Sequence, residues 1–194
     1  MKLLLLLGMI VTYPFNLTAD QTSIPKEILF KLEPTKKKFV LGEAVTFNFS
    51  VRNNSTKPII LIQVLNGSQR GLRWPMATLN AFDHKGRSIG NKFKRRCKNL
   101  DPFSPSDIIE IQSGKEFKAA QNGLFIFGEN FSKAGKYKVK FNYSTIEDDF
   151  KKYSGNSMSK ESYEKLVKEC GKLFKERLKV NFKTEIDIEI IPKN

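Results

Sequence analysis

Three segments of the chain alternate apolar and polar residues with a period of two, over residues 45–52, 136–143 and 180–190. This alternation is typical of β-strands that bury one face and leave the other in water. A shorter segment at 28–32 repeats the pattern, and weaker patterns predict strands near 76–83, 107–111, 116–119 and 123–127. The continuous apolar run from Ile59 to Leu65 predicts a central strand covered on both faces.

Turn-forming residues separate these segments, for example at Asn53-Asn54-Ser55 and Asp83-His84-Lys85-Gly86. Short strands divided by such turns are typical of antiparallel sandwiches. We therefore predict a mainly β chain that folds as an antiparallel β-sandwich of seven to eight strands.

One segment departs from the β pattern. Between Ser159 and Leu178 apolar residues recur at spacings of three and four, with charged residues on the opposite face. This predicts an amphipathic helix N-capped by Ser157 or Ser159. The helix falls between the last two alternating strands, so we expect a helical insertion near residues 157–178 within one domain spanning 20–194. Its apolar stripe either packs on the sandwich or serves a partner or a membrane surface; we favour packing.

Several short motifs carry a resemblance to a known class of domain. They are Phe39-x-x-Gly42-Glu43-x-Val45-x-Phe47, Val51-x-Asn53, Pro58-Ile59 and Gly135-x-Tyr137-x-Val139. Together they resemble the framework of secreted immunoglobulin-like modules, such as the BsuPI-type proteinase-inhibitor family and the Ig-like domains beside deuterolysin-type metallopeptidases. The resemblance implies an Ig-like sandwich, and it assigns no inhibitory role to individual residues.

The first residues predict export. Lys2 is followed by leucines from Leu3 to Leu7, further apolar residues reach Phe15, and a small residue stands at Ala19. This arrangement is typical of a signal peptide over residues 1–19, cleaved before Asp20, and it is short for a membrane span. We expect a secreted or periplasmic protein with no transmembrane segment after the signal is removed.

Positive charge is concentrated in the first half of the chain. Residues 1–100 hold 17 Lys and Arg against 5 Asp and Glu, whereas residues 101–194 hold 17 against 15. The densest cluster has no acidic residue and comprises Lys85, Arg87, Lys92, Lys94, Arg95, Arg96 and Lys98. A cluster of this kind attracts polyanions such as acidic glycans, lipopolysaccharide or an anionic membrane surface, or it is simply a solvated loop. We expect no specific nucleic-acid binding, because no recognition motif is present and the leader predicts export.

The two cysteines, Cys97 and Cys170, are expected in an oxidising compartment, which favours a disulfide between them. Such a bond would join the basic cluster to the apolar face of the helix and contribute about 4 kcal/mol by loop closure. The alternatives are a buried free Cys170 with Cys97 exposed or paired between molecules, and a catalytic thiol at Cys97 beside Arg96 and Lys98.

The sequence predicts no catalytic, cofactor or metal site. His84 is the single histidine, so a His-Glu-x-x-His zinc site or a multi-histidine cluster cannot be built, and its neighbours predict a turn. No spacing favours a carboxylate pair among Asp101, Asp107, Glu110, Glu147, Asp148 and Asp149.

We therefore expect a non-catalytic exported binding or envelope module with a basic surface, engaging a polyanion or another protein. The second hypothesis is a protease inhibitor that presents a loop to its target. The third is a hydrolase of unknown type.

Overall fold

The computed structural model describes residues 24–65, 72, 76–89, 103–126, 128–154 and 159–193. The predicted leader at 1–19 and the basic residues from Lys92 to Lys98 lie outside the described residues. The counts of strands, helices and ion pairs are those of the described residues.

Ten strands form three sheets in this part of the chain. The three-stranded sheet has the order β1 (Ile28–Pro34), β3 (Val45–Asn53) and β8 (Glu116–Ile126). The five-stranded sheet has the order β2 (Lys38–Val40), β10 (Asn181–Ile191), β9 (Gly135–Ser144), β5 (Ala77–Phe82) and β6 (Ser88–Ile89). A two-stranded ribbon pairs β4 (Ile59–Ile62) with β7 (Ile108–Ile111). All strand pairs are antiparallel except β10 with β2.

The helical elements are short apart from one. They are the 3-10 turns η1 (Pro105–Asp107) and η2 (Gly128–Asn130) and the helices α1 (Lys151–Ser154) and α2 (Lys160–Glu176). The mainly β prediction with one inserted helix is therefore confirmed, but seven to eight strands was too few. The strands β2 and β6 were missed because three and two residues are too short to show an alternation. The segments predicted at 116–119 and 123–127 belong to one strand, β8.

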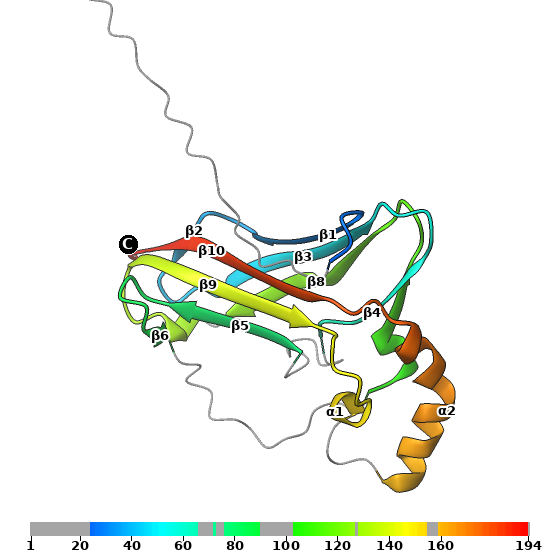
Figure 1. Cartoon of the computed structure of the whole chain (residues 1–194). Helices are drawn as coiled ribbons and strands as arrows, with labels where there is room; N and C mark the ends of the chain where they lie inside the picture. Colours follow the sequence, from blue (N-terminus) through cyan, green and yellow to red (C-terminus); the bar gives the residue numbers. More distant parts are fainter. Residues whose placement is uncertain are drawn as a thin grey trace, which may run out of the picture.

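The three- and five-stranded sheets pack face to face, and β9 and β10 lie across β3 and β1 in Figure 1. Aromatic side chains fill the space between the layers. The ring of Phe49 on β3 lies 5.3 Å from Phe141 and 5.6 Å from Tyr143 on β9. Phe30 on β1 stacks at 5.4 Å on Phe182 of β10. The apolar positions of the alternating segments therefore form the main core, as their period predicts.

The apolar run that begins at Ile59 is not a central strand of a large sheet. Among the described residues β4 pairs with β7 alone. Both faces of β4 nevertheless carry buried apolar side chains, because Leu61 packs in the main core and Ile62 packs in a second, smaller core. The prediction of two covered faces was right and the prediction of a central position was wrong, since two separate cores produce the same continuous apolar pattern.

The inserted helix packs on this second core at the end of the sandwich remote from the C-terminus (Figure 1). Ser159 caps it, because its Oγ accepts a hydrogen bond from the Ser162 N–H at 3.2 Å. The helix buries Leu166, Cys170 and Phe174. The other buried members of the second core are Ile62, Met76, Phe103, Phe150 and Tyr153. The packed alternative for the apolar stripe is thus the one that the structure adopts.

Candidate functional site

The outer face of the five-stranded sheet presents two columns of opposite charge. Successive residues of a strand point to opposite faces, so the lysines at 136, 138 and 140 of β9 all point outward. The acidic residues of β10 do the same. The register pairs Lys136 with Glu189, Lys138 with Asp187 and Lys140 with Glu185. We call this surface, with the adjoining 83–87 turn and Lys37 and Lys38, the β9–β10 face.

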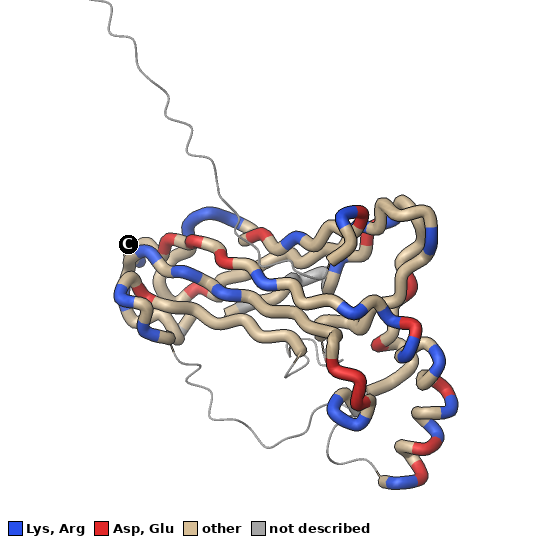
Figure 2. The backbone as a smooth tube through the Cα atoms, viewed as in Figure 1, with Lys and Arg blue, Asp and Glu red and all other residues tan. Residues whose placement is uncertain are grey.

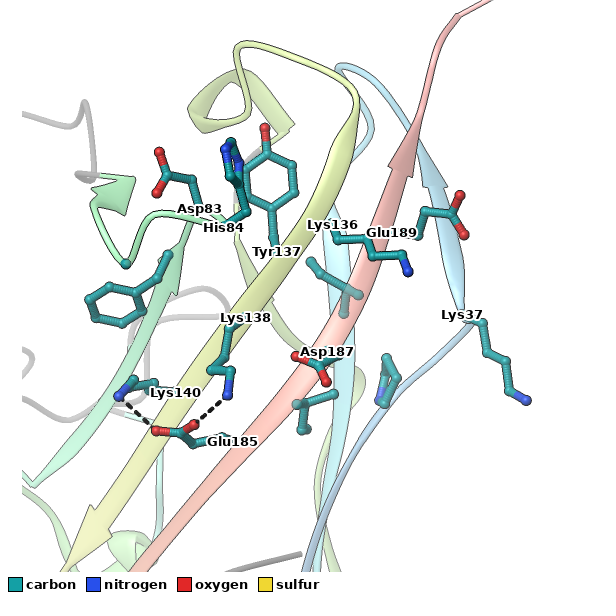
Figure 3. Close-up of a pocket in the computed structure, with 15 residues that line it drawn as sticks. Lys37, Asp83, His84, Lys136, Tyr137, Lys138, Lys140, Glu185, Asp187 and Glu189 are labelled. Carbon is teal, nitrogen blue, oxygen red and sulfur yellow. Dashed lines mark ion pairs between the residues drawn. The ribbon is translucent and has the colours of Figure 1, made fainter. Parts of the chain in front are cut away.

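Ion pairs order the centre of the β9–β10 face. The Glu185 carboxylate lies 2.7 Å from the Lys140 ammonium and 3.0 Å from that of Lys138, as the dashed lines in Figure 3 mark. These hydrogen bonds, first from Lys140 and then from Lys138, hold the pKa of Glu185 below its ordinary value. The hydrogen bond to Glu185 in turn raises the pKa of Lys138. Glu185 and Lys138 therefore stay charged across the neutral pH range.

A groove of about 890 Å³ crosses this face, from the 83–86 turn over β9 and β10 to Pro34 and Lys37 (Figure 3). A second depression of about 480 Å³ adjoins it and continues over the neutral residues Thr78, Asn80 and Asn142. Phe82, Lys140 and Glu185 line both hollows. The two hollows therefore share one wall on the outward side of the sheet, and we call them together the channel.

The turn between β5 and β6 is held by Asp83. Its Oδ1 accepts hydrogen bonds from the Lys85 and Arg87 N–H groups, both at 2.9 Å, and its Oδ2 accepts from the Arg87 side chain at 2.8 Å. Gly86, at φ 74°, supplies the left-handed conformation that closes the turn. Partial desolvation raises the pKa of the Asp83 carboxyl, but the hydrogen bonds from Arg87 and Lys85 outweigh it and bring the pKa to about 2. The predicted turn is confirmed, and it leaves the side chains of His84 and Lys85 exposed.

Of the predicted polyanion-binding residues, the structure describes Lys85 and Arg87. Arg87 is engaged by Asp83, at 2.7 Å, while its side chain is 71% exposed. Lys92, Lys94, Arg95, Arg96 and Lys98 lie outside the described residues. In the sequence these basic residues come shortly after β6, which is the edge strand of the five-stranded sheet.

The β9–β10 face carries a surplus of four positive charges. Its four acidic residues are Asp83, Glu185, Asp187 and Glu189. Its eight basic residues are Lys37, Lys38, Lys85, Arg87, Lys136, Lys138, Lys140 and, on β10, Lys183. Figure 2 shows this density of lysines and arginines toward the end of the sandwich where the C-terminus lies. Sequence reasoning singled out the cluster from Lys85 to Lys98 and missed the lysines of β9 with the acidic column beside them. The alternating Lys and Asp/Glu positions in the two strands were the available signal, but their register was not.

No group of three or more His, Cys, Asp and Glu side chains able to hold a metal ion occurs in the part of the chain that the structure describes. Glu147 pairs with Lys152 at 2.5 Å and Asp148 with Lys179 at 2.7 Å, so these carboxylates form surface ion pairs around α1. Asp101 lies outside the described residues.

Cys170 is buried, 1% exposed, and carries a free thiol in this structure. Desolvation, followed by the negative charges of Glu169 and Asp107, raises the pKa of the thiol. Cys97 lies outside the described residues, so the Cys97–Cys170 bond stays a prediction.

Comparison with known proteins adds little to this geometry. No protein-family model matches the chain. No curated protein matches it either. Among solved structures the chain is similar to a β-glucosidase from Listeria innocua in complex with isofagomine, at 11% identity and a TM-score of 0.34. The match covers 86% of this chain and 16% of the length of that protein.

Across the described residues, no helix is both long and apolar enough to cross a membrane. The resemblance to Ig-like modules and the export signal stay predictions.

Proposed function

We propose that this protein is an exported, non-catalytic binding module that engages polyanions through the β9–β10 face together with the basic sequence from Lys85 to Lys98. The observation that carries the proposal is the surplus of four positive charges on that face, directly beside β6, from which the basic sequence continues. The basic sequence contributes five further positive charges, at Lys92, Lys94, Arg95, Arg96 and Lys98.

Charges on a common surface act as a summed field, which raises the local concentration of a polyanion and its association rate. The ion pairs do not remove this effect. An ion pair has no net charge, so the field comes from the surplus of four positive charges, and it is screened beyond a Debye length of about 8 Å at physiological salt. The helix α2 makes a useful contrast, because its lysines and glutamates are mixed at positions three and four apart and give no net column of charge (Figure 2).

The test is a pair of matched fourfold variants. The first replaces Lys92, Lys94, Arg95 and Arg96 with Gln. The control replaces Lys160, Lys168, Lys172 and Lys175 of α2 with Gln, which removes equal charge from exposed sites and keeps helix propensity nearly unchanged. Retention on immobilised heparin and on vesicles containing phosphatidylglycerol is then measured over a series of salt concentrations.

The first variant should elute at clearly lower salt than the wild type, and the control should elute close to it. The affinity of the wild type should fall steeply with salt, as expected for polyanion binding. Equal loss in both variants would mean that net charge alone is responsible and that there is no site. No retention of the wild type at low salt would remove the polyanion proposal and leave the protease-inhibitor hypothesis as the better one.

A further inference from the structure

We propose that the channel on the β9–β10 face takes a linear acidic glycan with free hydroxyl groups, lying along β9 and β10. This inference rests on the proposed function and narrows its ligand class. It differs from binding of an anionic bilayer or of a phosphate polymer, which charge alone would equally allow.

The channel is lined by carboxylates as well as by lysines. Glu185, Asp187 and Glu189 line the groove among the lysines. A flat layer of anionic headgroups, or a chain of phosphates that carries acceptors only, would meet these carboxylates with like charge. A ligand that spaces its anionic groups between hydroxyl donors can place anions on the lysine column and hydroxyls on the acidic column. The neighbouring columns of opposite charge therefore favour a ligand with both kinds of group.

Asn142, at the second depression, holds a hydrogen-bond acceptor that no described residue uses. The Oδ1 atom of Asn142 is buried and has no hydrogen-bond partner among the described residues, and Asn142 lines the second depression. A buried acceptor without a partner is costly, so a donor that reaches it gains affinity. Thr78 lies opposite Asn142, and Asn80 lies opposite Lys140, in the register of β5 with β9. This end of the channel thus offers amide and hydroxyl groups, which suit sugar hydroxyls, beside the charged side chains of Lys140, Lys183 and Glu185.

An aromatic side chain, Phe82, lies where the two hollows of the channel meet. Phe82 is partly exposed, lines both hollows, and lies 5.4 Å from the Lys140 ammonium, measured to the ring centre. The face of a ring has a negative quadrupole that attracts the weakly positive C–H groups of a sugar ring, as it attracts the ammonium. A pocket with a few placed polar groups and one aromatic wall is typical of small-molecule and oligomer recognition.

The experiment uses two charge-neutral double variants of the full chain. Asn80→Ala/Phe82→Ser changes the channel. Leu29→Ser/Asn48→Ala makes the same kinds of change on the outer side of the other sheet, where both residues are exposed. Binding is measured by calorimetry with galacturonate oligomers, which carry a carboxylate and free hydroxyls on every residue, and with linear polyphosphate as a charge-only probe. Circular dichroism and thermal unfolding check that each variant is folded.

The channel variant should bind the galacturonate oligomers about tenfold more weakly than the wild type, a change of about 1.4 kcal/mol. Its binding of polyphosphate should be unchanged, and the control variant should behave as the wild type with both probes. Equal binding of the oligomers by channel variant and wild type would overturn the glycan inference, as would stronger wild-type binding of polyphosphate or phosphatidylglycerol vesicles than of the oligomers. Polyphosphate and vesicle binding without oligomer binding would leave the proposed function standing. Failure with all three probes would remove both.

Discussion

The guanidinium carbon of Arg177 lies 3.9 Å from the centre of the Phe174 ring, at the C-terminal end of α2. The arginine side chain is 1% exposed, and its N–H groups donate to the carbonyl oxygens of Phe174 and Thr145 at 2.7 and 3.1 Å, and also to that of Glu147. A buried cation is tolerated when its donors are satisfied in this way. Arg177 therefore joins the end of α2 to the chain that leads from β9 into α1.

The first prediction follows from that junction. Replacing Arg177 with Met keeps much of its volume but leaves buried carbonyl oxygens without donors, so the free energy of unfolding should fall by about 3 kcal/mol. The control is Lys179→Met, because Lys179 is half exposed and contacts Asp148 at 2.7 Å, a carboxylate that Arg177 contacts at 3.2 Å. That change should cost less than about 1 kcal/mol. Urea denaturation of both variants makes the comparison, and similar losses would mean that Arg177 is not the structural junction.

The second prediction concerns the packing of α2. Leu166→Ala should lower the free energy of unfolding by about 2–5 kcal/mol, because Leu166 is 5% exposed in the second core. Val167→Ala on the same helix is the control, since Val167 is 40% exposed. It should cost less than about 1 kcal/mol. A loss within a few tenths for Leu166→Ala would contradict burial and return the helix to a partner or membrane role.

The third prediction is the titration of Asp83. Carboxyl NMR should show a pKa near 2, and Arg87→Gln should move it toward the ordinary value of 3.8 because that change removes side-chain hydrogen bonds. The folded pKa lies below the unfolded one, so the ionised turn favours the folded state above about pH 4 and this contribution is lost as the pH falls toward 2. Glu185 serves as the internal control, since its pKa is lowered by Lys140 and Lys138 rather than by Arg87. An unchanged Asp83 titration in the variant would show that Arg87 does not hold the turn.

The fourth prediction concerns the cysteines and the leader. Phe103 packs in the second core together with Cys170. Cys97 comes six residues before Phe103 in the sequence, and six residues of extended chain can span roughly 20 Å. A Cys97–Cys170 bond is therefore within reach of the chain. Intact mass of protein from the exported fraction should correspond to a chain beginning at Asp20 and should rise by the mass of two hydrogens on reduction. Two free thiols would exclude the bond, and a chain still beginning at Met1 would exclude export.

The local patterns of the sequence determined most of the fold. Strands β3, β9 and β10 and the helix α2 were predictable, because each repeats its apolar period over at least eight residues and that period depends only on backbone geometry. The turn at Asp83 was also predictable from local sequence, because its hydrogen bonds join residues within a stretch of five.

Tertiary structure decided the features that join distant segments. The sequence shows lysines in one strand and carboxylates in another, but only the antiparallel register of β9 with β10 sets Lys140 beside Glu185 and makes two columns of charge. Only packing sends Leu61 and Ile62 into different cores and buries Arg177 against Phe174. The physical reason is that a local period specifies which face of an element is apolar, whereas the partner of that face is chosen by the packing of the whole chain.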